Sequence, residues 1–142
     1  MDMVAERIGY HLKRTCYALR SQMDHTLRTL QLTTPKYAAL CAIEEYPGSS
    51  GNRIARRCFV TAQTMNLILV SLEKAGLIER HPHPEYRRVL QTYLTPEGKR
   101  ILQESHHKIL SIEEAMLAGL AEDEQHQLLQ LLHSCAIALG KS

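Results

Sequence analysis

The apolar residues change their spacing twice along this chain, and this change constrains the fold more than any other feature of the sequence. Up to Gly76 they recur every three or four residues, which is the spacing of amphipathic helices. Over two short segments after Gly76, 77–80 and 89–94, they alternate as in β-strands. From Thr95 the helical spacing returns. The sequence therefore predicts a mainly helical protein that contains one small two-stranded hairpin.

Four helices are predicted before the hairpin. The first covers residues 3–31, where apolar side chains lie three or four residues apart and no proline intervenes. The second starts where a threonine N-cap is followed by Pro35 at the first helical position, and it stops at Pro47 and Gly48. These start and stop signals separate a long first helix from a shorter second one.

A break of two residues, Phe59 and Val60, separates the third predicted helix, 52–58, from the fourth, 62–75. Thr61 supplies an N-cap for the fourth helix, and Gly76 is expected to end it in a left-handed conformation. The side chains expected to face the core are Ile54, Ala55 and Cys58 on the third helix and Met65, Ile68, Leu69 and Leu72 on the fourth.

The hairpin and two further helices are predicted after the fourth helix. Residues 81–88, between the two strands, contain two prolines and several charges, which indicates a solvent-exposed tip. Thr95 and Pro96 repeat the cap signal and start a helix that runs to about Leu120. The last helix, 122–139, begins with three acidic residues, which suit the N-terminal end of the helix dipole.

Basic residues concentrate in the middle of the chain. The whole sequence carries a net charge of only +2. Residues 51–100 hold nine Lys or Arg and four acidic residues, whereas residues 101–142 hold two Lys or Arg and six acidic residues. A basic middle segment beside an acidic segment is the distribution expected of a polyanion-binding module with a separate assembly region. Charge alone leaves a solvated basic face as an equally good explanation.

The order helix, short turn, helix, glycine, strand, charged hairpin, strand indicates a helix-turn-helix followed by a wing. In that arrangement the second helix lies in the major groove of DNA and presents its N-terminal side chains to the base edges. Glutamine and asparagine amides can pair with adenine, and threonine offers a hydroxyl and a methyl group. The candidate base contacts are Thr61, Gln63, Thr64 and Asn66. A polar, solvated first turn is the plainer explanation of the same residues.

Arginines on both sides of that helix are candidates for phosphate or minor-groove contacts. Such contacts supply affinity and salt dependence rather than readout of the major groove. The candidates are Arg53, Arg56 and Arg57 on the preceding helix and Arg80, Arg87 and Arg88 on the hairpin.

Residues 32–98 resemble the MarR family of transcriptional regulators in an ordered set of short segments. No single segment is decisive, but the ordered set is highly specific, and the flanking helices match in length and order. The matching segments are Leu32–Pro35 with Tyr37, Ile54–Arg57, Val60–Met65, Leu72–Arg80, Arg87–Arg88 and Leu94–Gly98.

The resemblance implies one domain over residues 1–142, mainly α-helical with a small two-stranded wing. Within it, residues 33–95 are expected to form a winged helix-turn-helix that binds double-stranded DNA, and residues 3–31 and 96–140 a helical dimerisation region. Members of this family are obligate homodimers that bind pseudo-palindromic operators, usually to repress transcription. Many release DNA when a small aromatic molecule binds, and others respond to cysteine oxidation or to a metal.

Two positions depart from the family pattern. The recognition helix often carries an arginine where this chain has Leu67, so a phosphate contact is expected to be weaker, or an apolar side chain is placed against thymine methyl groups. The wing normally carries an acidic residue two positions before Arg88, and here that position is Tyr86, with Glu85 beside it as a possible substitute. A helical protein-interaction module with degenerate DNA reading is therefore an alternative function.

A small aromatic effector is the family's usual ligand, and four residues on the first two helices are candidates to bind it. An arginine or histidine can pair with a carboxylate while tyrosine rings stack on the ligand. The candidates are His11, Arg14, Tyr17 and Tyr37, although a packing or surface role is the plainer explanation for each.

The cysteines indicate no zinc ribbon or thioredoxin-type motif, because no Cys-x-x-Cys pair is present. Each lies at a position where a helix favours an apolar residue, so burial as a small hydrophobe is expected. The peroxide-sensing branch of the family places its reactive cysteine at the position of Gly9 and a partner tyrosine at that of Thr34, so its mechanism does not transfer. Cys16 is a candidate redox sensor if it is exposed. The four cysteines are Cys16, Cys41, Cys58 and Cys135.

No catalytic, cofactor or metal site is expected. The sequence has no nucleophile elbow, phosphate-binding loop or dinucleotide fingerprint, so an enzyme is not predicted. Neither His81 with His83 nor the adjacent His106 and His107 belongs to a cluster that supplies the four ligands zinc prefers. Residues 1–7 do not resemble a secretory signal, and no apolar run is long enough to span a membrane, so a cytoplasmic protein is expected.

Overall fold

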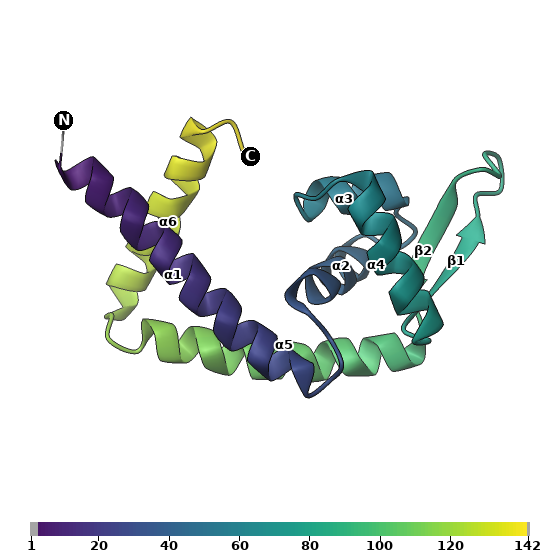
Figure 1. Cartoon of the computed structure of the whole chain (residues 1–142), viewed down its shortest axis with the longest axis horizontal. Helices are drawn as coiled ribbons and strands as arrows, with labels where there is room; N and C mark the ends of the chain where they lie inside the picture. Colours follow the sequence, from purple (N-terminus) through teal and green to yellow (C-terminus); the bar gives the residue numbers. More distant parts are fainter. Residues whose placement is uncertain (1–2, 142) are drawn as a thin grey trace. The chain divides into compact units, whose positions relative to one another are not determined.

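The computed structural model describes residues 3–141, and within them it contains six helices and one antiparallel two-stranded sheet (Figure 1). The predicted fold class, mainly α with one small hairpin, is confirmed. These residues fall into two compact units, one up to Ile109 and one from Leu110. In chain order the elements are α1 (Met3–Arg28), α2 (Thr34–Glu45), α3 (Gly51–Arg57), α4 (Ala62–Lys74), β1 (Ile78–Pro82), β2 (Leu90–Leu94), α5 (Pro96–Leu117) and α6 (Glu122–Ala138).

Hydroxyl side chains start α2, α3 and α4. The hydroxyl oxygens of Thr33, Ser50 and Thr61 each accept a hydrogen bond from the amide three residues further on, at 3.1–3.3 Å. Each bond satisfies one of the amides that a helix leaves unpaired in its first turn. The expected cap of α2 was one residue off. Thr33 is the cap rather than Thr34, because the Thr34 amide and hydroxyl both donate to the carboxylate of Asp24 on α1.

The first unit has its core where α2, α3 and α4 pack together, with the hairpin extending beyond them (Figure 1). On α4, Met65, Leu69 and Leu72 are fully buried as predicted, whereas Ile68 is only half-buried. On α3, Ile54 and Ala55 are buried and Cys58 is half-buried. The remaining large buried side chains include Leu27, Leu32, Leu40, Ile43, Leu77, Ile78, Leu102 and Ile109.

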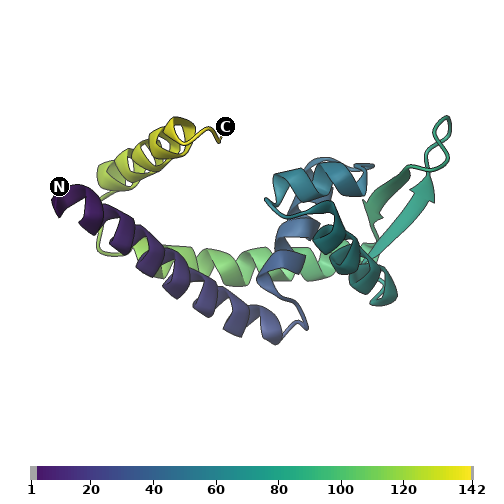
Figure 2. The same cartoon turned by 45° about the horizontal axis from the view of Figure 1, so that its top comes forward.

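The two strands pair in antiparallel register, from Ile78 opposite Leu94 to Pro82 opposite Leu90. The predicted first strand, 77–80, was therefore placed too early, because the pairing extends through His81 and Pro82. The tip lies between the strands, at residues 83–89 rather than 81–88. Figure 2 shows this tip standing clear of α2, α3 and α4.

A tight junction holds the end of α4, the start of β1 and the start of α5 together. Gly76 has φ +75°, the left-handed conformation that the sequence predicted. The Thr95 hydroxyl donates to the Gly76 carbonyl at 2.6 Å and accepts from the Gly98 amide at 3.0 Å. A Cβ atom on Gly98 would lie 1.9 Å from the Leu77 carbonyl oxygen, so only glycine fits there. The wing therefore leaves α4 in a fixed direction.

Two long helices end earlier than predicted. α1 ends at Arg28 instead of residue 31, because Gln31 adopts φ 59° and the Leu32 amide turns back to the Leu27 carbonyl at 3.0 Å. α5 ends at Leu117 instead of about Leu120. In the second unit the side-chain amide of Gln125 donates to the carbonyl of Leu117 at 3.3 Å and to that of Leu120 at 3.2 Å. These two hydrogen bonds fix the turn into α6.

The last helix, α6, has no buried residue among those described. Its apolar stripe is open to solvent and includes Leu129, Leu131, Leu132 and Cys135. The expectation that Cys135 is a small buried hydrophobe was wrong for the single chain, because none of the described residues of α6 is buried. Among the helices of residues 3–141, none is long and apolar enough to cross a lipid bilayer.

Candidate nucleic-acid interface

The first turn of α4 presents polar side chains to solvent. Gln63, Thr64 and Asn66 are exposed, while Met65 between them is fully buried and fixes the rotation of the helix. Thr61 is exposed too, but its hydroxyl caps the helix and donates to the Thr64 hydroxyl at 3.0 Å. We call Thr61, Gln63, Thr64 and Asn66 the reading face. Its two amide side chains have no hydrogen-bond partner among the described residues, so both remain available to a ligand.

The three arginines of α3 are exposed, and one of them is oriented by an aromatic ring. The guanidinium of Arg57 lies 3.4 Å from the centre of the Tyr46 ring, in a cation–π contact. Arg53 and Arg56 project from the same short helix, whose buried side, Ile54 and Ala55, packs into the core. Sequence reasoning missed Tyr46, because no local pattern links the residue that ends α2 to the end of α3.

Arg80 on β1 is not the free cation that the sequence suggested. Its guanidinium contacts the Glu73 carboxylate of α4, with Nη2 at 3.2 Å and Nε at 3.5 Å, and only 13% of its side chain is exposed. The ion pair joins the wing to α4 and neutralises part of the Arg80 charge. Arg87 and Arg88 at the hairpin tip are exposed.

The hairpin tip is shaped by a histidine rather than by an acidic side chain. His83 Nδ1 accepts from the amides of Glu85 and Tyr86, both at 3.1 Å, and the His83 and Tyr86 rings lie 5.2 Å apart. No ion pair between Glu85 and Arg88 is present among the described residues. Glu85 therefore does not replace the acidic residue that the family pattern places at position 86.

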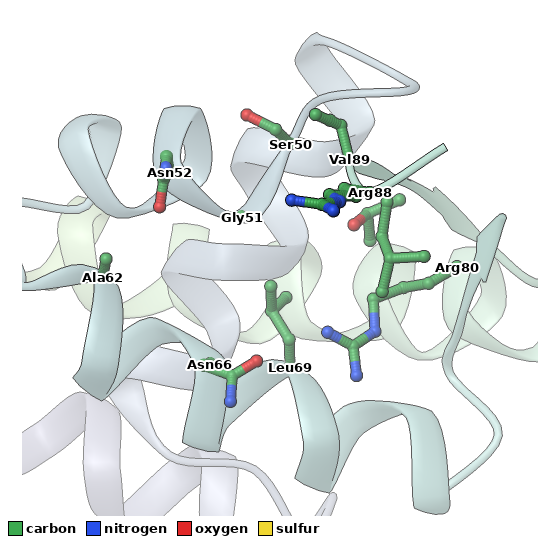
Figure 3. Close-up of a pocket in the computed structure, with 11 residues that line it drawn as sticks. Ser50, Gly51, Asn52, Ala62, Asn66, Leu69, Arg80, Arg88 and Val89 are labelled. Atoms are coloured by element: carbon green, nitrogen blue, oxygen red, sulfur yellow. The ribbon is translucent and has the colours of Figure 1, made fainter. Parts of the chain in front are cut away.

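A cleft of about 290 Å³ lies between the start of α3, the outer side of α4 and the wing. Figure 3 shows Asn66 of α4 and the guanidinium groups of Arg80 and Arg88 around the same opening. The lining contains these two cations and no acidic residue. It also contains Thr92, whose buried hydroxyl has no hydrogen-bond partner among the described residues. The cleft between Asn66 and the wing is therefore lined by cationic rather than acidic side chains, and the charge of Arg88 is not offset by an ion pair among the described residues.

The candidate effector residues lie on two helices and differ in exposure. His11, Arg14 and Tyr17 are all exposed on α1, with Tyr17 77% exposed. Tyr37 is half-buried on α2, and its hydroxyl lies 2.7 Å from His106 Nδ1 on α5. The other nitrogen of that histidine, Nε2, lies 3.1 Å from the Glu44 carboxylate. Sequence reasoning did not connect Tyr37 with His106, because 69 residues separate them.

The four cysteines are free thiols and fall into two groups that differ in solvent exposure. Cys16 and Cys135 are exposed, so their predicted burial was wrong for the single chain. Cys41 and Cys58 are half-buried, and loss of hydration raises the pKa of the Cys41 thiol to about 11 and raises that of Cys58 as well. Both of these thiols are protonated at neutral pH and therefore poor nucleophiles. Within residues 3–141, no three His, Cys, Asp or Glu side chains are grouped so that they could hold a metal ion.

Solved structures with the same architecture include proteins bound to DNA or to aromatic acids. A transcriptional repressor, CouR, bound to a 23-mer DNA duplex superposes with a TM-score of 0.86 at 26% identity, covering 96% of this chain and 98% of that one. The Mycobacterium tuberculosis protein Rv2887 in complex with salicylic acid gives a TM-score of 0.72 at 30% identity, covering 89% and 94%. The regulator PcaV of Streptomyces coelicolor with its natural ligand superposes with a TM-score of 0.78 at 25% identity, covering 98% of this chain and 97% of PcaV.

Sequence comparison also relates this chain to transcriptional regulators. Residues 30–88 match the model of the MarR family. The transcriptional repressor Rv2887 of Mycobacterium tuberculosis is 30% identical, covering 88% of this chain and 90% of the repressor. The regulator HosA of Escherichia coli is 30% identical, covering 81% and 95%. The chain thus belongs to the MarR family of winged helix-turn-helix transcriptional regulators.

Proposed function

We propose that this protein is a transcriptional repressor that binds a pseudo-palindromic operator as a homodimer, with α4 in the major groove and the wing on the sugar–phosphate backbone. One observation carries the proposal: the exposed amide of Asn66 on α4 borders a cleft lined by two arginines and no acidic residue. The names of the relatives, which are repressors and regulators, and the DNA-bound state of CouR support it.

Base recognition is assigned to the reading face. The amides of Gln63 and Asn66 each carry a donor and an acceptor, which matches the N6 and N7 atoms of adenine. The Thr64 hydroxyl can serve either a base or a phosphate. Thr61 acts mainly as the helix cap, because its hydroxyl is already engaged with the Thr64 amide and hydroxyl. The adenine preference therefore rests on Gln63 and Asn66.

Backbone contacts are assigned to the exposed arginines that surround the reading face. Arg87 and Arg88 lie at the tip of the wing. The three other exposed arginines lie on α3, which packs against α4. Arg80, held by Glu73, acts as a fixed cation at the side of the cleft rather than as an extended arm. The assigned residues are Arg53, Arg56, Arg57, Arg80, Arg87 and Arg88.

Dimerisation is assigned to residues 3–31 and 96–140. Helix α6 buries none of its described residues within one chain, and α1 also exposes large apolar side chains. Apolar surface of this extent is unfavourable in water and marks a protein–protein contact. A second copy of the chain is the proposed occupant. The exposed apolar residues include Ile8, Leu12 and Tyr17 of α1 and Leu129, Leu131, Leu132 and Ile137 of α6.

The proposed location of the protein is the cytoplasm. The proposed effector is a small aromatic acid. The salicylate complex of Rv2887 supports this ligand class. The candidate contacts are His11, Arg14, Tyr17 and Tyr37. A thermal-shift screen of aromatic acids tests it, and no shift with any of them contradicts it. Oxidation of the exposed Cys16 is the second candidate signal, and an unreactive Cys16 in the native protein excludes it.

The experiment that tests the proposed function is selection of duplexes from a randomised pool at fixed salt, followed by sequencing. Recovery of an inverted repeat with half-site centres about one helical turn apart, or a multiple of it, is the expected result. Weak binding without a motif contradicts the proposal and favours a protein-interaction module with degenerate DNA reading.

A further inference from the structure

One large apolar side chain stands on the outer surface of α4, where the proposed function places DNA. Leu67 is 69% exposed, whereas Met65 and Leu69 on either side of it are fully buried. Two residues correspond to roughly 200° of rotation on an α-helix, so Leu67 lies on the side of α4 opposite these core residues. A leucine there contributes nothing to the core of the chain.

Leu67 follows Gln63 by four residues, which places it on the same outer side one turn further along the helix. Docking that brings Gln63 and Asn66 to base edges therefore brings Leu67 against the same groove. An arginine at this position could reach a phosphate, but a leucine has no polar atom to offer.

The base edges in the major groove present mainly hydrogen-bonding groups, and the one methyl group among them is the C5-methyl group of thymine. Packing a leucine against base edges that carry unpaired polar groups costs free energy, because those groups lose water and gain no partner. Packing it against a methyl group removes apolar area of both partners from water, which is favourable. The chemistry of Leu67 thus selects one kind of base.

We propose that Leu67 is a specificity-determining residue that contacts the C5-methyl group of one thymine in each operator half-site. This inference rests on the proposed function, since it requires α4 to lie in the major groove. It adds a thymine to the adenines assigned to Gln63 and Asn66, and it makes a 5-methylated cytosine the natural mimic of that thymine.

The test removes single methyl groups from the operator recovered by selection. Each thymine is replaced by deoxyuridine, in both half-sites together, and the dissociation constant is measured by fluorescence anisotropy. Loss of one buried methyl contact weakens binding about fourfold per half-site, and so about fifteenfold for the symmetric pair. One symmetric thymine pair is expected to show this loss with the wild-type protein.

Leu67→Ala assigns the effect to the side chain. Because Leu67 is exposed in the free chain, the variant is expected to keep the wild-type melting temperature. It is expected to bind the thymine and deoxyuridine operators equally well at the sensitive position. Lys74→Ala is the control, since it trims another exposed side chain of the same helix, one that lies outside the reading face, and should keep the sensitivity assigned to Leu67.

A cytosine operator provides the converse test. When the sensitive T·A pair is changed to C·G, 5-methylation of that cytosine should improve binding by the wild-type protein and leave the Leu67→Ala variant unaffected. Sequence-selective binding with no deoxyuridine effect, or an effect that survives in Leu67→Ala, overturns the inference while the proposed function stands. Absence of any sequence-selective binding instead overturns the proposed function.

Discussion

Single residues fix the direction in which the wing leaves the helix-turn-helix. Gly98 on α5 packs against the backbone of Leu77, and Thr95 links the Gly76 carbonyl to the Gly98 amide. These contacts connect three elements within a few residues, so their loss is expected to affect stability and the position of the arginines on the wing together.

Gly98→Ala is expected to destabilise the protein by about 3 kcal/mol, because the new methyl group meets backbone that cannot move without breaking the junction. Urea unfolding measures the change. Gly119→Ala is the control, since a Cβ atom there meets nothing within 4 Å. Equal unfolding midpoints for Gly98→Ala and the wild type would show that the junction is not tight.

Asp24 makes stability depend on pH at the joint between α1 and α2. Hydrogen bonds from Thr34 hold the pKa of its carboxyl below the usual value, with a smaller contribution from the charge of Arg20. A carboxyl whose pKa is lowered by folding stabilises the protein above its unfolded-state pKa, near 4, and this stabilisation disappears as the pH falls through the folded-state pKa.

Asp24→Asn is therefore expected to lower the melting temperature at pH 7 and to make less difference as the pH falls below about 4. Thermal melts from pH 7 to pH 2.5 measure this dependence. A difference between variant and wild type that stays constant over the whole range would mean that ionisation of Asp24 has no part in the joint.

In the proposed complex with DNA, α4 supplies base readout and the arginines of the hairpin supply affinity. Arg88→Ala removes an exposed cation of the wing tip, so the slope of log K against log salt is expected to become shallower by roughly 2 for a dimer, or about 0.9 for each lost phosphate contact. The preferred sequence should not change. Titrations between 50 and 250 mM salt measure the slope.

Lys141→Ala is a control, because it removes a cation outside the winged helix-turn-helix. If Arg88→Ala and Lys141→Ala give the same slope as the wild type, the wing tip makes no phosphate contact.

The elements themselves were largely predictable from local signals. Thr61 before α4, Gly76 after it and Thr95 before α5 each act within three or four residues of the chain, and all were identified from the sequence. Strand alternation gave the hairpin but not its ends, because pairing of His81 and Pro82 depends on the opposite strand.

Side-chain partners were not predictable, because they join different elements whose packing no local pattern specifies. The Arg80–Glu73 ion pair crosses from β1 to α4, the Arg57–Tyr46 contact joins the ends of α3 and α2, and Tyr37 meets His106 across 69 residues. The sequence identified the arginines as cations but could not say that one of them is already paired.

In the proposed dimer, contact between the two chains covers the apolar surface that one chain leaves open. Leu132→Asp on α6 places a charge on the exposed stripe and is expected to shift the protein from dimer to monomer at micromolar concentration, with a parallel loss of operator affinity. Sedimentation equilibrium measures the mass.

Gln130→Asp introduces the same charge at an exposed polar position of α6 and should leave the dimer intact. A wild-type protein that sediments as a monomer, or a Leu132→Asp variant that remains dimeric, contradicts the assigned dimerisation region.

Selection from randomised duplexes, carried out in parallel with wild-type protein and Asn66→Ala, tests most directly that α4 reads sequence in both halves of an operator. The wild-type pool is expected to yield an inverted repeat. The variant pool should keep the repeat but lose its preference at one position in each half, with a discrimination loss of about 1–3 kcal/mol against the wrong base. An unchanged motif in the variant, or no inverted repeat in the wild type, would contradict the account.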